Sequence, residues 1–303
     1  MELTIKDIRK VLILGSGTMG LRIGLQSALS GYQTVIYDIQ EKAFASAKKI
    51  QESILSQLLE KKIISGSAAE AARQLISFTL NAEEAARDAD FVSESVLEEI
   101  NVKKEVWSKF APLLPPKAIL TTNTSYLLPS MFATETCRPE RFCAFHFHDV
   151  FLANVVDVMP HAGTEPWVAD LLMEMGKKLN QTPVLVKKES PGYIFNAMLV
   201  ALIGAAGALV TYDVASIEDV DRSWMGNFKM PSGPFGILDA IGLDTAWHVT
   251  NALPDAKSKK FAALLKTYVD AGKLGQKSGE GFYTYPNPGF VQKDFINKQE
   301  TMV

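Results

Sequence analysis

His146 and Asp157 are the residues of this sequence best suited to proton transfer near neutral pH. The chain has four histidines and none lies in the first 145 residues, so candidates for acid–base chemistry are few. His146 follows the β-rich run 141–145, and Asp157 lies 11 residues further on, inside the apolar run 155–158. A carboxylate beside an imidazole fixes its tautomer and favours its protonated form. Taken alone, His146 is better explained as a hydrogen-bonded core histidine. A carboxylate inside an apolar strand needs a partner, however, and His146 can provide it. The two residues together therefore predict a general acid/base.

The residues that follow His146 raise the question of a metal site. The run His146-x-His148-Asp149 has no companion ligands at the spacing of known metal sites, so we predict no metal ion here. The other two histidines, His161 and His248, lie apart from this cluster, and we expect them to take no part in the chemistry.

A glycine-rich turn near the N-terminus predicts a binding site for phosphates. The apolar run 11–14 leads into Gly15-Ser16-Gly17-Thr18-Met19-Gly20, and the helical pattern 21–29 follows. In such a turn Gly15 permits the tight bend, Gly17 lets the backbone approach a pyrophosphate, and Gly20 lets helix and strand pack closely. The helix N-terminus then offers free N–H groups to the phosphates. The predicted site includes Thr18 and Met19.

Asp38 is a second feature that is typical of a dinucleotide-binding site. It ends the predicted strand 34–37 and lies 18 residues beyond Gly20. An acid at this point accepts hydrogen bonds from the adenosine ribose 2′-OH and repels a 2′-phosphate. A helix cap or turn acid is the alternative, but the strand, glycines, helix and acid are all in register. They predict dinucleotide binding, with NAD preferred over NADP because no arginine follows Asp38.

Ser125 is a further candidate for the site. It belongs to the run Asn123-Thr124-Ser125, which follows the predicted strand 118–122 at the edge where open parallel sheets bind cofactors. Its hydroxyl could hydrogen-bond both a substrate oxygen and a nicotinamide. The alternative, an ordinary turn or N-cap serine before Pro129, stays open at this point.

The elements that must position these residues alternate as in a parallel α/β fold. Strand-like runs alternate with helical patterns up to about residue 188, after which the pattern is mostly helical. We therefore predict a Rossmann-type, mostly parallel sheet domain over residues 1–189 and an all-helical domain over 190–303. A long helix is expected over 42–62, and Ser67 and Asn81 have N-cap spacing to Glu70 and Glu84. The predicted strands are 11–14, 34–37, 75–79, 91–95, 118–122, 141–147, 155–159 and 184–187.

Composition excludes several classes of protein. With 303 residues, 47% hydrophobic, the chain can bury a packed core and is not disordered. A net charge of −3 with interspersed signs argues against nucleic-acid and membrane-surface partners. The two cysteines, Cys137 and Cys143, are too few for a disulfide framework, and no signal-peptide pattern opens the chain, so we expect a cytoplasmic protein.

One apolar stretch allows two interpretations. Residues 190–212 contain no charged side chain and could in principle span a bilayer. Asn196 and three glycines lie inside it, and it lacks aromatic belts and an asymmetry of flanking Lys and Arg. We therefore predict a buried helix at the centre of the second domain, where it could also form a dimer interface.

Together these segments resemble the 3-hydroxyacyl-CoA dehydrogenase family of NAD-dependent enzymes of fatty-acid and butanoate metabolism. The resemblance extends over nearly the whole chain. It includes, besides the motifs above, Ser190-Pro191-Gly192-Tyr193-Ile194-Phe195-Asn196, Gly233-Pro234-Phe235, Gly242-Leu243-Asp244 and Lys277-Ser278-Gly279-Glu280-Gly281-Phe282-Tyr283.

The resemblance implies a role for each matching residue. His146 is the catalytic base, Asp157 stands where the family has a glutamate that orients it, and Ser125 and Asn196 hold the reacting oxygen of the substrate. Lys61 falls where a lysine meets the phosphate of CoA. Positions that contact NAD are Glu98, Lys103, Ser125 and Lys277. The family also implies a helical, dimer-forming second domain, and hence a homodimer.

This sequence departs from the family pattern after His146. The family's H-F-F-N-P is here His146-Phe147-His148-Asp149-Val150, so the asparagine that touches nicotinamide is absent and His148 or Asp149 stands in. The interval from His146 to Asp157 is also one residue shorter than usual. The resemblance implies reversible, NAD-dependent oxidation of a short-chain L-3-hydroxyacyl-CoA, such as 3-hydroxybutyryl-CoA. Alternatives are a sister enzyme that reduces free 3-oxo acids or diketo esters, and a non-catalytic, crystallin-like dinucleotide-binding protein.

Overall fold

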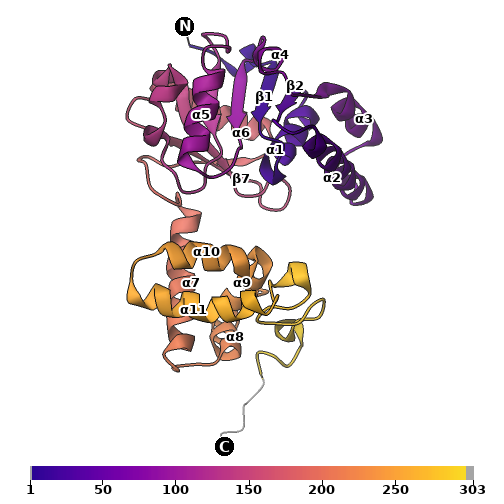
Figure 1. Cartoon of the computed structure of the whole chain (residues 1–303). Helices are drawn as coiled ribbons and strands as arrows, with labels where there is room; N and C mark the ends of the chain where they lie inside the picture. Colours follow the sequence, from indigo (N-terminus) through magenta and orange to yellow (C-terminus); the bar gives the residue numbers. More distant parts are fainter. Residues whose placement is uncertain (1, 298–303) are drawn as a thin grey trace, which may run out of the picture. The chain divides into compact units, whose positions relative to one another are not determined.

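A single eight-stranded sheet carries most of the predicted site residues. The computed structural model describes residues 2–297 and divides the chain into two units, Met1–Ile194 and Phe195–Val303 (Figure 1). The strands lie in the order β3-β2-β1-β4-β5-β6-β7-β8, and every neighbouring pair is parallel except β6 with β7. Their bounds are β1 Lys10–Leu14, β2 Gln33–Tyr37, β3 Ile76–Thr79, β4 Phe91–Glu94, β5 Ile119–Thr122, β6 Phe142–Phe147, β7 Val155–Pro160 and β8 Thr182–Leu185.

Helices cover both faces of this sheet, which explains the almost continuous apolar runs of its central strands. Side chains alternate between the faces of a strand, so Leu12 and Ile13 of β1 belong to different clusters of the core. Leu12 packs in the cluster of Trp107, and Ile13 in that of Leu172. The helices of this unit are α1 Thr18–Leu29, α2 Glu41–Glu60, α3 Gly66–Leu75, α4 Ala82–Ala86, α5 Ile100–Phe110 and α6 Pro166–Lys178.

Of the two helix N-caps predicted from spacing, one is confirmed and one is wrong. Asn81 is the N-cap of α4, and its Oδ1 accepts hydrogen bonds from the N–H groups of Glu83 and Glu84. The predicted cap at Ser67 is wrong, because Ser65 caps α3 by accepting from the N–H of Ala68. Two serines two positions apart both fit the start of this helix, and spacing alone did not separate them.

The second unit is helical in its described part. Its helices are α7 Phe195–Thr211, α8 Ile217–Phe228, α9 Pro234–Ile241, α10 Leu243–Ala252 and α11 Ala256–Asp270. With the mostly parallel sheet of the first unit, this confirms the predicted fold class. Among the described residues, no helix is long and apolar enough to cross a membrane.

The apolar stretch 190–212 forms helix α7, but the prediction that this helix is buried is wrong within this chain. Only Ile203, Ala206 and Gly207 are buried along α7, and the Met198 side chain is 61% exposed. Phe261 of α11 lies so close that a Cβ on Gly207 would be 2.4 Å from its ring. The helix therefore packs through a narrow stripe, and among the described residues apolar side chains such as Met198 and Leu209 remain exposed on it.

Two buried aspartates organise the second unit. Asp239 accepts the backbone N–H groups of Phe282 and Tyr283, each at 2.9 Å, and a Cβ on Gly281 would lie 2.1 Å from its Oδ1. Asp221 accepts the N–H groups of Phe235 and Gly236 in the first turn of α9. The motifs around Gly233 and Gly281 are therefore needed to build this unit, whatever else they do.

Candidate active site

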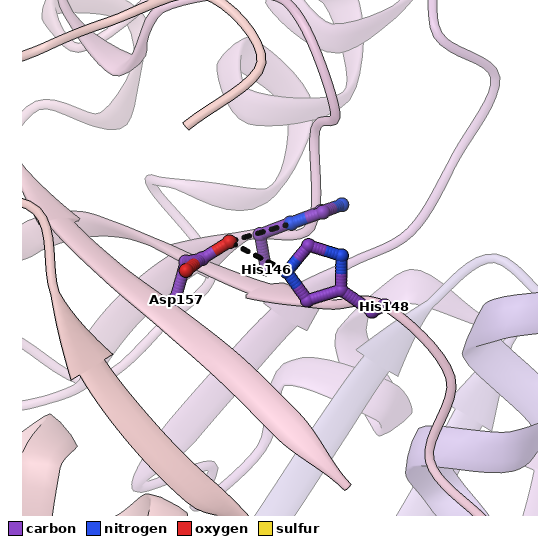
Figure 2. A group of neighbouring side chains, drawn as sticks. All are labelled: His146, His148 and Asp157. Carbon is purple, nitrogen blue, oxygen red and sulfur yellow. Dashed lines mark hydrogen bonds and ion pairs between the residues drawn. The ribbon is translucent and has the colours of Figure 1, made fainter. Parts of the chain in front are cut away.

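The antiparallel pair β6–β7 brings His146 and Asp157 together. In its register His146 of β6 lies directly opposite Asp157 of β7. Because side chains two positions apart share a face of a strand, His148, just past the end of β6, projects to the same side as His146. Figure 2 shows the two imidazole rings converging on the carboxylate of Asp157.

One carboxylate oxygen serves both rings. Asp157 Oδ2 lies 2.8 Å from His148 Nε2 and 3.4 Å from His146 Nδ1, and the Asp157 side chain is only 2% exposed. Burial raises the pKa of Asp157, but the hydrogen bonds from the two imidazoles and their charges outweigh it and lower the pKa below its usual value. An ionised carboxylate only accepts, so both ring nitrogens that face it carry the proton.

This arrangement leaves Nε2 of His146 as the ring's basic nitrogen. Ser125 Oγ lies 3.3 Å from Nε2, and Tyr193 stacks on the ring with centroids 4.6 Å apart and an interplanar angle of 12°. Burial lowers the pKa of His146; the bond to Asp157 opposes this, and the charge of His148 adds to the lowering. The site thus holds a neutral imidazole whose lone pair points towards a serine hydroxyl.

The same three residues are close enough together for a metal ion. Single donor atoms of His146, His148 and Asp157 all lie within 4.8 Å of one another. Each of these atoms already has a hydrogen-bond partner within the group. Hydrogen bonding therefore accounts for their convergence without an ion, and the absence of a metal stays a prediction.

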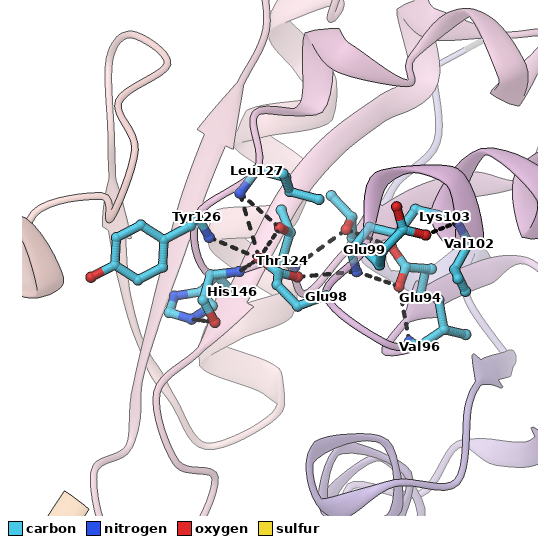
Figure 3. Close-up of polar contacts among 12 residues, drawn as sticks. Glu94, Val96, Glu98, Glu99, Val102, Lys103, Thr124, Tyr126, Leu127 and His146 are labelled. Atoms are coloured by element: carbon cyan, nitrogen blue, oxygen red, sulfur yellow. Dashed lines mark hydrogen bonds and ion pairs between the residues drawn. The ribbon is translucent and has the colours of Figure 1, made fainter. Parts of the chain in front are cut away.

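Glu98 holds the loop that carries Ser125 (Figure 3). Its Oε1 accepts hydrogen bonds from Thr124 Oγ1 at 2.6 Å, from the Ser125 N–H at 2.8 Å and from the Tyr126 N–H at 2.9 Å. Burial raises the pKa of Glu98, and the nearby Lys103 charge together with these bonds lowers it below the usual value. The carboxylate predicted to touch NAD therefore also fixes the position of Ser125.

Lys103 is buried behind this loop. Its side chain is 1% exposed, and its Nζ lies 2.7 Å from Oε1 of Glu94, at the end of β4, and 3.3 Å from Oε2 of Glu98. Glu94 also accepts from Thr122 Oγ1 at 2.6 Å, where β5 ends. These charges connect the carboxyl ends of two central strands to the loop. Sequence reasoning gave Glu94 no role, although an acid ending an apolar strand is a signal.

The glycine turn fits the phosphates of a dinucleotide. Gly15 has a φ of +102°, and a Cβ on Gly20 would lie 2.0 Å from the carbonyl oxygen of Gly15. Both positions therefore need glycine for the strand, turn and helix to meet. A Cβ on Gly17 would meet no atom within 4 Å, so the backbone at the start of α1 is open to a pyrophosphate. Thr18 and Met19 form the first turn of α1.

Asp38 fixes the glycine turn to the end of β2. Its Oδ2 accepts from the N–H of Ser16 at 2.8 Å and from Ser16 Oγ at 2.6 Å, and its Oδ1 accepts from the N–H groups of Ile39 and Gln40. The contact of Asp38 with the adenosine ribose stays a prediction.

Both residues that could replace the family asparagine, His148 and Asp149, form contacts within the first unit. His148 donates to Asp157, and Asp149 forms an ion pair with Arg22 of α1. The other oxygen of Asp149 accepts the N–H groups of Phe151 and Leu152, so Asp149 shapes the loop after β6. No sequence pattern indicates the Arg22 contact, because 127 residues separate the two side chains.

Three predicted site residues remain, Lys61 in the first unit and Asn196 and Lys277 in the second. Lys61 is exposed at the C-terminal end of α2. In the second unit, Asn196 lies in the first turn of α7, and Lys277 Nζ contacts both carboxylate oxygens of Asp244 at 2.6 Å. Their roles stay predictions. Tyr193 was missed, although it stood in a recognised motif; its hydroxyl donates to the carbonyl of Thr124 at 2.6 Å.

Comparison with known proteins covers both units. The family model of the 3-hydroxyacyl-CoA dehydrogenase NAD-binding domain matches residues 10–190, and that of the C-terminal domain matches residues 192–285. A probable 3-hydroxyacyl-CoA dehydrogenase of Caenorhabditis elegans is 31% identical over 293 residues, which cover 93% of this chain and 94% of that protein.

Solved structures agree with this match. A diketoreductase, described for substrate-directed dual catalysis of dicarbonyl compounds, has 37% identity and a TM-score of 0.87, with 92% of this chain and 99% of that chain covered. The (S)-3-hydroxybutyryl-CoA dehydrogenase PaaH1 from Ralstonia eutropha has 29% identity and a TM-score of 0.82, with 92% and 100% covered. The predicted resemblance is confirmed: the chain belongs to the 3-hydroxyacyl-CoA dehydrogenase family and is an NAD-dependent oxidoreductase.

Proposed function

We propose that this protein catalyses the reversible, NAD-dependent oxidation of short-chain L-3-hydroxyacyl-CoA, such as 3-hydroxybutyryl-CoA, to 3-oxoacyl-CoA. The observation that carries this proposal is the placement of the His146 imidazole, with Nδ1 towards buried Asp157 and Nε2 towards Ser125. Its support from comparison is the family itself and relatives named for the 3-hydroxybutyryl-CoA substrate.

In this mechanism His146 Nε2 removes the proton of the 3-hydroxyl group. The chemistry that NAD would supply when bound is acceptance of the hydride from C3, and Gly17, Asp38 and the start of α1 would hold its pyrophosphate and ribose. The Ser125 hydroxyl donates to the reacting oxygen, and we assign Asn196 the same task. Asp157 stabilises the imidazolium that forms at His146. In the reverse direction His146 returns the proton to the 3-oxo group.

A panel of substrates tests this proposal. The purified full-length chain is incubated with NADH and acetoacetyl-CoA, acetoacetate or a diketo ester, and NADH oxidation is followed by absorbance. We expect kcat/KM to be highest for acetoacetyl-CoA. Turnover of the diketo ester or acetoacetate alone would instead support the sister reductase. Absence of turnover with all three, despite tight NADH binding, would support the non-catalytic alternative.

The sister reductase is the second candidate because of one specific likeness. The diketoreductase is more similar in sequence, at 37% identity, than the 3-hydroxybutyryl-CoA dehydrogenase structure, at 29%. The sequence also departs from the family pattern directly after His146, near the predicted substrate. Lys61 helps to separate the candidates: Lys61→Ala should raise KM for acetoacetyl-CoA and leave KM for a free 3-oxo acid unchanged.

Cofactor preference provides a separate prediction. Replacing Asp38 by Asn keeps the size of the side chain but removes the charge that repels a 2′-phosphate. We expect the ratio of the NADPH and NADH dissociation constants to fall about tenfold or more. Fluorescence titration with each nucleotide measures it. Glu41→Gln, at the start of α2, is the matched control and should leave the ratio unchanged. An unchanged ratio in the Asp38 variant would show that Asp38 does not select the cofactor.

We also propose that the protein acts as a cytoplasmic homodimer. The apolar side chains of α7 that are exposed in the described part of the chain, such as Met198 and Leu209, support a second copy as partner. Light scattering after gel filtration should give twice the mass of the chain. A monomer at micromolar concentration would contradict the homodimer.

A further inference from the structure

We propose that His148 is a positioning residue for the acid–base pair: it holds Asp157 by a hydrogen bond and thereby keeps His146 proton-free at the working pH. This inference rests on the proposed function of His146 as the base. It differs from the predicted cofactor contact, because the described Nε2 of His148 is directed at a carboxylate of the same sheet.

The distances distinguish the two histidines. His148 Nε2 is 2.8 Å from Asp157 Oδ2, an ordinary hydrogen-bond length, whereas His146 Nδ1 is 3.4 Å from the same oxygen, beyond the usual range for N–H···O. An aspartate is one methylene shorter than the glutamate that the family resemblance implies. The shorter side chain is therefore held chiefly by His148 and leaves His146 with the weaker bond.

Sharing the carboxylate has a chemical consequence. A carboxylate that accepts a strong bond from one imidazole attracts a proton on the other less strongly. Any positive charge on His148 also opposes a second positive charge on His146, since their ring centroids are 4.7 Å apart. Both effects make protonation of His146 harder and so maintain the lone pair at Nε2.

The other groups facing His146 do not supply this effect. Asp157 from β7 and Glu98 from the loop after β4 are negative, and both favour the protonated imidazole. Tyr193, stacked on the ring, is a neutral phenol that donates to Thr124, and Ser125 is an uncharged hydroxyl. Burial of the ring lowers the pKa of His146, and among the groups named here His148 is the one that lowers it further.

The pH dependence of two variants tests the role of His148. His148→Phe removes the hydrogen-bond donor and the basic ring nitrogens, whereas His148→Gln keeps an N–H donor. In the oxidation direction, activity is lost as pH falls through the pKa of the base. We therefore expect His148→Phe to move this acidic limb of kcat/KM to higher pH by roughly one unit and to lower kcat about tenfold. His148→Gln should restore most of kcat and give an intermediate limb.

A cofactor-contact role gives a different pattern. Under our proposal the dissociation constant for NADH stays unchanged in both variants. A weaker NADH affinity with an unmoved acidic limb would overturn the proposal and favour the contact with nicotinamide. His248→Phe is the matched control, because His248 is exposed on α10, and it should leave every one of these quantities unchanged.

An NMR measurement separates failure of this inference from failure of the proposed function. In the full chain labelled with ¹⁵N-histidine, the four imidazoles are followed through a pH titration without substrate. We expect the proton on Nδ1 of His146 and on Nε2 of His148, and a higher midpoint for His146 in His148→Phe. An unmoved midpoint would overturn the inference even with full turnover. If the His146 midpoint moves but no substrate is turned over, the coupling between His148 and His146 is supported and the proposed dehydrogenase function is refuted.

Discussion

Replacing His146 by alanine should lower kcat about 10²–10⁴-fold and leave the dissociation constant for NADH unchanged. The expected size follows from the contribution of a positioned general base. His146 Nε2 is the basic nitrogen that faces Ser125, and Ser125 is a hydroxyl that does not accept protons near neutral pH. Steady-state kinetics on the preferred substrate and fluorescence titration with NADH measure the two quantities.

Two further variants make this result specific. His248→Ala removes an exposed histidine and should leave kcat unchanged. Asp157→Asn keeps the shape of the side chain but loses a charge that stabilises the imidazolium, and it should lower kcat less than His146→Ala. Full turnover in His146→Ala, with folding and NADH binding intact, would show that another group is the base.

Replacing Lys103 by methionine should lower the free energy of unfolding by about 3–5 kcal/mol. The ammonium group is 2.7 Å from Oε1 of Glu94, and the two side chains are 1% and 0% exposed. Methionine fills a similar volume but leaves the Glu94 carboxylate buried without its cation, and such an uncompensated charge is costly. Chemical denaturation of the full chain, followed by fluorescence, measures the change.

The neighbouring lysine provides the control. Lys104 pairs with Glu135 at the surface, where both side chains are partly exposed, so Lys104→Met should cost about 0–1 kcal/mol. The double variant Glu94→Gln with Lys103→Met removes both charges and should recover part of the loss. Equal effects of Lys103→Met and Lys104→Met would mean that burial of the Glu94–Lys103 pair does not matter for stability.

The first unit was largely predictable because its strands are short apolar runs with clear breaks. All eight strands lie within about two residues of their predicted positions, and the turn Gly15–Gly20 lies between strand and helix as expected. His146 and Asp157 could be paired in advance because a buried acid needs a partner. Their register across β6 and β7 then follows from the antiparallel hairpin.

The less predictable features depend on contacts between distant segments. The bond between His148 and Asp157 needs both the antiparallel register and the direction of a side chain beyond the end of β6. The contacts of Glu98 with the loop of Ser125 join residues about 27 positions apart. The exposure of α7 depends on how much of its surface α11 covers, which hydrophobicity alone does not tell. The N-cap of α3 is Ser65 rather than Ser67, and spacing along the sequence does not distinguish two serines so close together.

The direct pairing of His146 with Asp157 across β6 and β7 has a consequence for how this enzyme can vary. A cross-strand pair keeps its alignment when the connecting segment lengthens or shortens, provided that the ladder itself does not slip. The segment from Val150 to Asn154 can therefore gain or lose residues while the base and its carboxylate stay aligned. Grafts of this segment from relatives of other lengths should therefore leave the base and its carboxylate aligned.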